Sequence, residues 1–177
     1  MKPGILKGRI WVITDPDTDK LINNIDTDMI YHNAHLAVTE IEKMGQYAFG
    51  NLTGWKDFPK KAGEGDIVVC GTNFGSGSSR QHAVDCFRAL GVQLIIAGSF
   101  GAIYKRNAIN SGMPILTYPD VDDAKIKSGD EVEVDLEKGK LKNITTGEYL
   151  PNADPFSIVQ MDIYRAGDLF EYAKALG

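Results

Sequence analysis

The sequence predicts an α/β protein built on a parallel βαβ unit, and three stretches of the chain support that prediction. Residues 67–70 form a short apolar run with β-branched side chains, which is typical of a strand buried on both faces. Residues 71–77 are rich in glycine, serine and asparagine, which indicates a tight turn. A second apolar run at 92–97 follows a helical stretch, so the two strands are expected to pair in parallel.

The helix between these two strands is expected to begin at Ser79 and to end before Gly91. Its inward residues recur at spacings of three and four, and they are Ala83, Val84, Phe87 and Leu90. Gly91 stands where a helix C-cap takes the left-handed conformation, which glycine adopts without steric cost.

One strand and one helix are predicted ahead of this unit. Residues 5–13 alternate loosely between apolar and polar, as a strand does. Thr39 and Glu42 form a capping-box pattern for a helix that runs through about Phe49. The side chains expected to point inward from this helix are Ile41, Met44 and Ala48. A surface connection with Trp55 as its one aromatic anchor should then lead to the βαβ unit.

The C-terminal part of the chain is predicted to add a helix, a strand, a hairpin and a last helix. The helix is expected at 102–110 and the strand at 115–118. Alternating residues on both sides of a turn at 137–140 predict an antiparallel hairpin. The pair Asp154–Pro155 has the residue types of an N-cap and a first helical position, and the helix should break at Gly167.

Size and composition are those of a globular protein. The chain has 177 residues, 43% of them hydrophobic and 24% charged, so we expect residues 1–177 to form a single domain. A formal net charge of −5 argues against nucleic acid or an anionic membrane as the main partner. The sequence shows neither a membrane-span-length apolar run nor a signal-peptide pattern, and we expect a cytoplasmic protein.

The sequence does not predict a metal site. Cys70 and Cys86 are the only cysteines, and they are interpreted as buried thiols of a reduced protein. Two cysteines and three histidines cannot by themselves hold an iron–sulfur cluster. His32 and His35 have a spacing that suits a metal, but no third ligand is evident. The acidic stretch 15–26 partly matches a calcium loop, yet it lacks the required glycine and glutamate, which favours a solvated turn.

The glycine-rich loop is the stretch with chemical potential. It ends at Ser78, Ser79 and Arg80, where free N–H groups and the dipole of a following helix favour an anion. A guanidinium there fits a carboxylate or a phosphate in a bidentate way. The alternative is that one of the serines merely caps the helix. The loop matches neither a Walker loop nor a dinucleotide fingerprint, because it lacks the lysine and the third glycine these require.

Three ordered motifs resemble a known family. They are Asp26-Thr-Asp-x-Ile30, then Gly75-Ser-Gly-Ser-Ser-Arg-Gln-His-Ala83, then Gly98-Ser-Phe-x-x-Ile103-x-x-x-Asn107. Together they are similar to the small subunits of two-chain hydro-lyases of the aconitase superfamily, with 3-isopropylmalate dehydratase of leucine biosynthesis as the nearest fit. The resemblance covers nearly the whole chain and implies a swivelling β/β/α domain.

The resemblance also implies a reaction and a division of labour between two chains. The family removes water from a 2-hydroxy acid and adds it back at the neighbouring carbon. A [4Fe–4S] cluster belongs to the large subunit, so this chain would bind no metal and be inactive alone. Carried onto this sequence, the resemblance makes Ser78 the base. The residues implied to bind substrate or line the site are Asp26, Asp28, Gly77, Ser79 and Arg80.

Substrate choice is implied to lie in the loop His35-Leu36-Ala37-Val38. Relatives that act on tricarboxylates carry an arginine in this loop, whereas this chain has none between Arg9 and Arg80. A branched, apolar substrate such as 3-isopropylmalate is therefore favoured. His35 and Ala37 depart from the tyrosine and larger aliphatic residue of isopropylmalate enzymes. This leaves 2,3-dimethylmalate dehydratase or homoaconitase small subunit as alternatives.

Two hypotheses of other classes remain open at this point. The chain could be a stand-alone module that binds a carboxylate or phosphate through Ser78 to Arg80. It could also be a structural domain without a site, although two polar clusters beside a glycine-rich loop argue against that.

Overall fold

A mixed sheet of six strands forms the centre of the computed structural model, which describes all 177 residues. The strands lie in the order β4-β3-β2-β1-β5-β6. Their bounds are β1 Ile5–Val12, β2 Ile67–Cys70, β3 Leu94–Ala97, β4 Ile115–Thr117, β5 Glu131–Asp135 and β6 Lys140–Asn143. The first four strands are parallel, whereas β5 runs antiparallel to both β1 and β6. The predicted parallel core with an added hairpin is confirmed.

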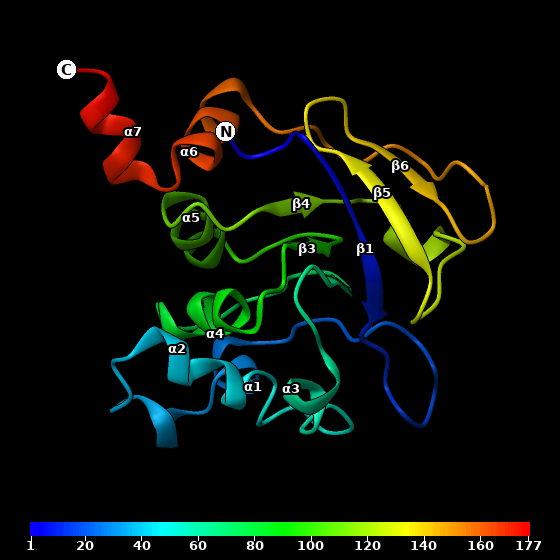
Figure 1. Cartoon of the computed structure of the whole chain (residues 1–177). Helices are drawn as coiled ribbons and strands as arrows, with labels where there is room; N and C mark the ends of the chain where they lie inside the picture. Colours follow the sequence, from blue (N-terminus) through cyan, green and yellow to red (C-terminus); the bar gives the residue numbers. More distant parts are fainter.

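Seven helices surround the sheet (Figure 1). They are α1 Thr27–Ile30, α2 Ile41–Met44, α3 Phe58–Lys61, α4 His82–Leu90, α5 Ala102–Asn110, α6 Ile158–Ala166 and α7 Leu169–Ala175, with 3₁₀ turns at Asn33–His35, Gly45–Tyr47 and Val121–Asp123. Helices α1 to α4 gather on one side of the parallel strands, and α6 and α7 lie on the opposite side near the N-terminus. No helix has the length and apolar content that crossing a membrane requires.

The buried strands place alternate side chains in two different cores. Val68 and Cys70 of β2 face a cluster built with the helices α1 to α5. Ile67 and Val69 face a second cluster that contains side chains of the β5–β6 hairpin and of α6. Because the hairpin covers one face of the parallel strands and helices cover the other, the layers follow the β/β/α order.

The region 39–49 differs from the predicted single helix. It forms two short turns, the residue before α2 is Glu40, and no side chain caps that helix, so the capping-box prediction is wrong. Ile41 is exposed, whereas Met44 and Ala48 are buried as expected. The chain leaves the helical path because Phe49 has φ +57° and its N–H donates to the carbonyl of Ile30 at 2.8 Å.

Two further predictions need correction. The connection after Phe49 has two aromatic anchors and not one, because Phe58 is fully buried and partly buried Trp55 also packs against the core. The last helices start with α6, whose N-cap is Ser157 and not Asp154. The N–H of Asp154 instead donates to the carbonyl of Thr117 at 2.9 Å, which keeps this segment extended beside β4. The predicted break at Gly167 is confirmed.

Asp66 ties β1 to the start of β2. Its carboxylate accepts hydrogen bonds from Arg9 Nη2 at 2.7 Å, Trp11 Nε1 at 2.8 Å and the N–H of Gly63 at 2.8 Å. The side chain is 7% exposed. Burial raises the pKa of Asp66, but the hydrogen bonds from Arg9, Trp11 and Gly63 outweigh it and hold the pKa below its ordinary value.

Replacing Asp66 by asparagine should lower the free energy of unfolding at pH 7 by about 1–3 kcal/mol, because a charged acceptor of three donors is lost. The folded-state pKa is depressed, so this stabilisation is present above the unfolded value of about 3.9 and is lost as the pH falls through the folded pKa. Urea unfolding of the wild type and of Asp66→Asn, at pH 7 and in acid, measures this effect. The difference in free energy of unfolding between the two proteins should be smaller in acid. A difference that stays constant with pH would contradict the assignment. Glu133→Gln, which removes a surface pair with Lys7, is the control and should have little effect.

Candidate functional site

The candidate site forms where the segment 25–28 pairs with the glycine-rich loop. The N–H of Gly75 donates to the carbonyl of Ile25 at 2.7 Å, and the N–H of Thr27 donates to the carbonyl of Ser76 at 2.9 Å. Asp26 and Ser76 form an isolated parallel bridge at this point. The start of α1 and the loop after β2, about fifty residues apart in sequence, are thereby fixed side by side.

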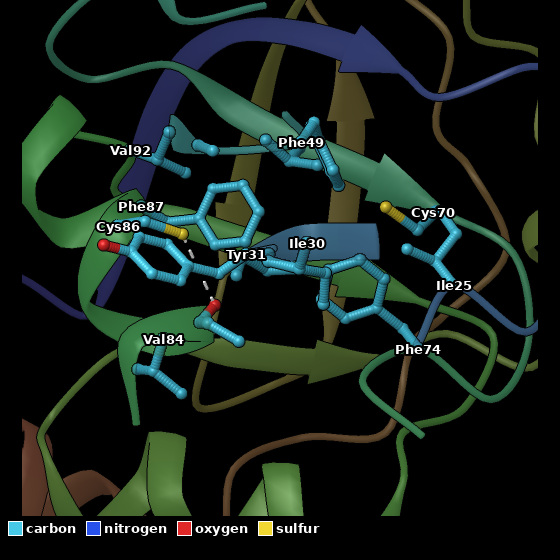
Figure 2. Close-up of a cluster of buried hydrophobic side chains, with 14 of the residues drawn as sticks. Ile25, Ile30, Tyr31, Phe49, Cys70, Phe74, Val84, Cys86, Phe87 and Val92 are labelled. Carbon is cyan, nitrogen blue, oxygen red and sulfur yellow. Dashed lines mark hydrogen bonds between the residues drawn. The ribbon is translucent and has the colours of Figure 1, made fainter. Parts of the chain in front are cut away.

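A dense aromatic and aliphatic core supports both segments (Figure 2). Ile25, Ile30 and Tyr31 come from the first segment and Phe74 from the loop, and all four are buried. Phe74 packs against Phe87 of α4, with the ring centroids 6.3 Å apart. The backbone of the site is therefore fixed by burial of its own apolar neighbours.

Two glycines shape the loop for different reasons. Gly75 has φ +77°, and a Cβ at this position would lie only 2.2 Å from the ring of Tyr104, so no larger residue fits. Gly77 has φ +101° with its Cβ direction largely open, so backbone conformation is what requires glycine there.

The two serines do not cap helix α4. The helix begins at His82, three residues later than predicted, and its N-cap Gln81 makes no side-chain capping bond. The backbone N–H groups of residues 76–82 donate no hydrogen bond within the chain, and Ser78 and Ser79 are exposed. An exposed row of unpaired N–H groups ahead of a helix is suited to bind an anion.

Arg80 is held on one side and unpaired on the other. Its Nη1 donates to Asp28 Oδ1 at 3.0 Å and to the carbonyl of Tyr31 at 2.8 Å, and its side chain is 13% exposed. Its Nε and Nη2 atoms make no hydrogen bond within the chain. That unpaired edge of the guanidinium has the geometry for a bidentate carboxylate.

Asp28 is the residue that orients Arg80. Besides Arg80, its carboxylate accepts from the N–H of Asn33 and from Asn51 Nδ2, both at 3.0 Å. The hydrogen bond from Arg80 lowers the pKa of Asp28, partial burial opposes this, and the N–H of Asn33 lowers it further. The structure thus brings together Asp28 and Arg80, two residues that were each predicted to lie at the site.

The remaining predicted residues are placed as follows. Asp26 is the N-cap of α1 and accepts from the N–H of Met29 at 2.8 Å. Ser78 Oγ lies 3.4 Å from Thr27 Oγ1. Ser79 Oγ accepts from Asn107 Nδ2 of α5 at 3.1 Å.

Three of the contacting residues were not expected at the site from the sequence. Thr27 and Asn107 lie within the quoted motifs, and a stricter use of those motifs would have included them. Asn51 lies in the connection after Phe49, where the sequence carries no signal for it.

The loop 35–38 is fastened beside Arg80. His82 Nε2 and the carbonyl of Val38 are 2.9 Å apart, and the Tyr31 hydroxyl donates to the carbonyl of His35 at 3.0 Å. The ring of His35 stacks on Tyr47 with the centroids 3.9 Å apart. Leu36 and Ala37 are exposed and have no such restraint. The apolar side chains available to a ligand are therefore those in the middle of the loop.

The residues of this chain do not fit an iron–sulfur cluster. Cys70 and Cys86 are both free and fully buried, and burial raises the pKa of each thiol well above its ordinary value. A cluster ligand must be a thiolate, which burial disfavours here. No group of three or more His, Cys, Asp or Glu side chains is arranged to hold a metal ion.

Comparison with known proteins identifies the family. Residues 8–121 match the aconitase C-terminal domain, a span that contains every candidate site residue. The chain belongs to this family. Relatives that match it over nearly their whole length include 3-isopropylmalate dehydratase small subunits, so the chain belongs with these small subunits of the aconitase superfamily.

Individual relatives illustrate the extent of the match. The isopropylmalate/citramalate isomerase small subunit of Methanocaldococcus jannaschii is 43% identical over 96% of this chain and 94% of its own. The 3-isopropylmalate dehydratase small subunit of Aquifex aeolicus is 43% identical over 95% and 94%. The crystal structure of 3-isopropylmalate dehydratase from M. jannaschii superposes with a TM-score of 0.84 at 33% identity, covering 97% of this chain and 95% of the other. The β/β/α fold predicted from the motifs is confirmed.

Arg80→Gln should raise the pKa of Asp28 towards its ordinary value, because the hydrogen bond from Arg80 is the largest cause of its depression. Carboxyl carbon NMR titration of Asp28 in both proteins measures the change. Lys174→Gln, which removes a cation on the C-terminal helix α7, is the control and should leave the Asp28 titration unchanged. An Asp28 titration that is the same with and without Arg80 would show that the pair does not form in solution.

Proposed function

We propose that this chain is the small subunit of a hydro-lyase that isomerises a branched 2-hydroxy dicarboxylic acid, with 3-isopropylmalate as the favoured substrate. The observation that carries the proposal is the arrangement around Arg80. One nitrogen of its guanidinium is fixed by Asp28, and its Nε and Nη2 are unpaired beside exposed Ser78 and a row of free N–H groups. Such a set of donors is suited to a substrate carboxylate, which supports the proposal.

In the proposed mechanism Ser78 is the base. Arg80 and Ser79 hold a substrate carboxylate, while Asp26, Asp28 and Gly77 line the site. Ser78 Oγ takes the proton from the substrate carbon, and the C–H electron pair becomes the new double bond as the neighbouring hydroxyl leaves. The same oxygen returns the proton when water is added back. A serine oxygen serves as a base only where its anion is stabilised, and the unpaired N–H groups and Arg80 supply such donors.

The proposed partner is a cluster-bearing large subunit. A [4Fe–4S] cluster on that subunit would supply the Lewis acid for the leaving hydroxyl. The surface of this chain supports a divided site. Three hollows of about 730, 360 and 420 Å³ are lined by neither Ser78 nor Arg80, and Ser78 is exposed, where another chain can cover it.

The proposed substrate follows from the loop 35–38. Exposed Leu36 and Ala37 offer apolar contact, and the loop carries no cation for an additional carboxylate. One relative is named for both isopropylmalate and citramalate, two acids with different branches, so the branch size is a matter for experiment. We further propose that residues 1–177 act as one domain in the cytoplasm, in line with the two unpaired thiols.

Anaerobic reconstitution with the cluster-bearing subunit from the same genome tests the function. The substrates to compare are 3-isopropylmalate, citramalate, 2,3-dimethylmalate and homocitrate, assayed by absorbance of the unsaturated product. We expect turnover that requires both chains and favours a branched dicarboxylate. Ser78→Ala should abolish this turnover and leave subunit association and substrate binding largely intact, because only the proton acceptor is removed.

Other outcomes of this experiment would contradict the proposal. Normal turnover by Ser78→Ala would refute the base assignment. A formed complex with an intact cluster and no turnover would refute the substrate class. Failure of the two chains to associate, with binding of a carboxylate or phosphate by the lone chain, would favour the stand-alone binding module.

A further inference from the structure

Thr27 is a buried residue whose hydroxyl faces the proposed base. It is 3% exposed and is the first residue of α1. Its Oγ1 lies 3.4 Å from Ser78 Oγ, and this is the only hydrogen-bond partner of its side chain. Its backbone N–H donates to the carbonyl of Ser76 at 2.9 Å, so the residue is fixed against the loop that carries Ser78.

The position of Thr27 leaves its hydroxyl proton free for Ser78. Within a helix, a threonine hydroxyl commonly donates to a carbonyl three or four residues earlier. Thr27 stands at the first position of a four-residue helix, so no helical carbonyl precedes it, and its hydroxyl makes no bond to the backbone.

The chemistry of two facing hydroxyls changes when one of them is ionised. While both carry protons, either oxygen can donate. Once Ser78 has lost its proton, its oxygen can only accept, and Thr27 becomes the donor. Hydrogen bonds to charged acceptors are stronger than those between neutral groups, and a buried donor cannot be replaced by water without exposure.

We propose that Thr27 is a positioning residue, which fixes the Ser78 oxygen and donates a hydrogen bond to it in its deprotonated form. This inference rests on the proposed role of Ser78 as the base. Thr27 acts through Ser78 and does not contact the substrate.

The test compares three variants in the reconstituted two-subunit enzyme. Thr27→Val keeps the branched shape and removes the hydroxyl, Thr27→Ala removes the hydroxyl and the branch, and Thr27→Ser keeps the hydroxyl. We expect Val and Ala to lower kcat by about 10- to 100-fold with little change in KM, because a hydrogen bond to an anion is lost. Thr27→Ser should retain most of the activity.

The pH dependence of kcat separates this role from a merely structural one. Loss of the donor destabilises the deprotonated form of Ser78. The acidic limb of the kcat profile should therefore move to higher pH in Thr27→Val and Thr27→Ala but not in Thr27→Ser. The inference would be overturned if kcat among the three variants depended on the size of the side chain and not on the presence of a hydroxyl. It would also be overturned if the acidic limb of the kcat profile stayed at the same pH in Thr27→Val and Thr27→Ala.

Ser78→Ala distinguishes a failure of this inference from a failure of the proposed function. If Ser78→Ala retains turnover, the base assignment itself is wrong. If Ser78→Ala abolishes turnover while Thr27→Val behaves as wild type, only the role of Thr27 is wrong. In any residual activity of Ser78→Ala, adding Thr27→Val should cause no further loss, because the two residues act as one unit.

Discussion

The pairing of residues 25–27 with the glycine-rich loop is the constraint on which the site depends. Two backbone hydrogen bonds, from Gly75 to Ile25 and from Thr27 to Ser76, set the register between the two segments. That register brings Thr27 to Ser78, and Asp28 can then fix the guanidinium of Arg80. The pairing is backbone to backbone, and the buried apolar side chains around it hold the frame on which the polar side chains of the site stand.

The conformation of the glycine-rich loop depends on its packing against the core. Gly75 must be glycine because the ring of Tyr104 occupies the space of any Cβ, and Phe74 beside it is buried. The loop therefore cannot relax towards a regular helix start, and α4 begins only at His82. The consequence is a row of unpaired N–H groups on the surface. Unpaired N–H groups are costly when they are buried, but exposed ones can donate hydrogen bonds to a ligand.

The sequence predicted the parallel strands, helix α5 and the hairpin well, because burial on both faces and strict alternation leave clear periodic patterns. It misplaced the starts of α2, α4 and α6. At α6 a long-range bond from Asp154 to Thr117 keeps the predicted N-cap in an extended segment, and the bond from Phe49 to Ile30 ends the helical turns that follow α2. The motifs located Arg80 and Asp28, but only the structure shows that the carboxylate of Asp28 pairs with the guanidinium of Arg80. Sequence spacing carries no information on the register between distant segments.

Hydrogen–deuterium exchange in the assembled complex tests whether the loop 76–82 binds the substrate carboxylate within a two-chain enzyme. The N–H groups of residues 76–82 lack partners in the chain and should exchange rapidly until an anion occupies them. We expect 3-isopropylmalate to slow exchange in peptides covering 76–82, and not in those covering the β5–β6 hairpin. The Arg80→Gln complex should lose this protection. Unchanged exchange of the loop in a complex saturated with substrate would contradict the claim.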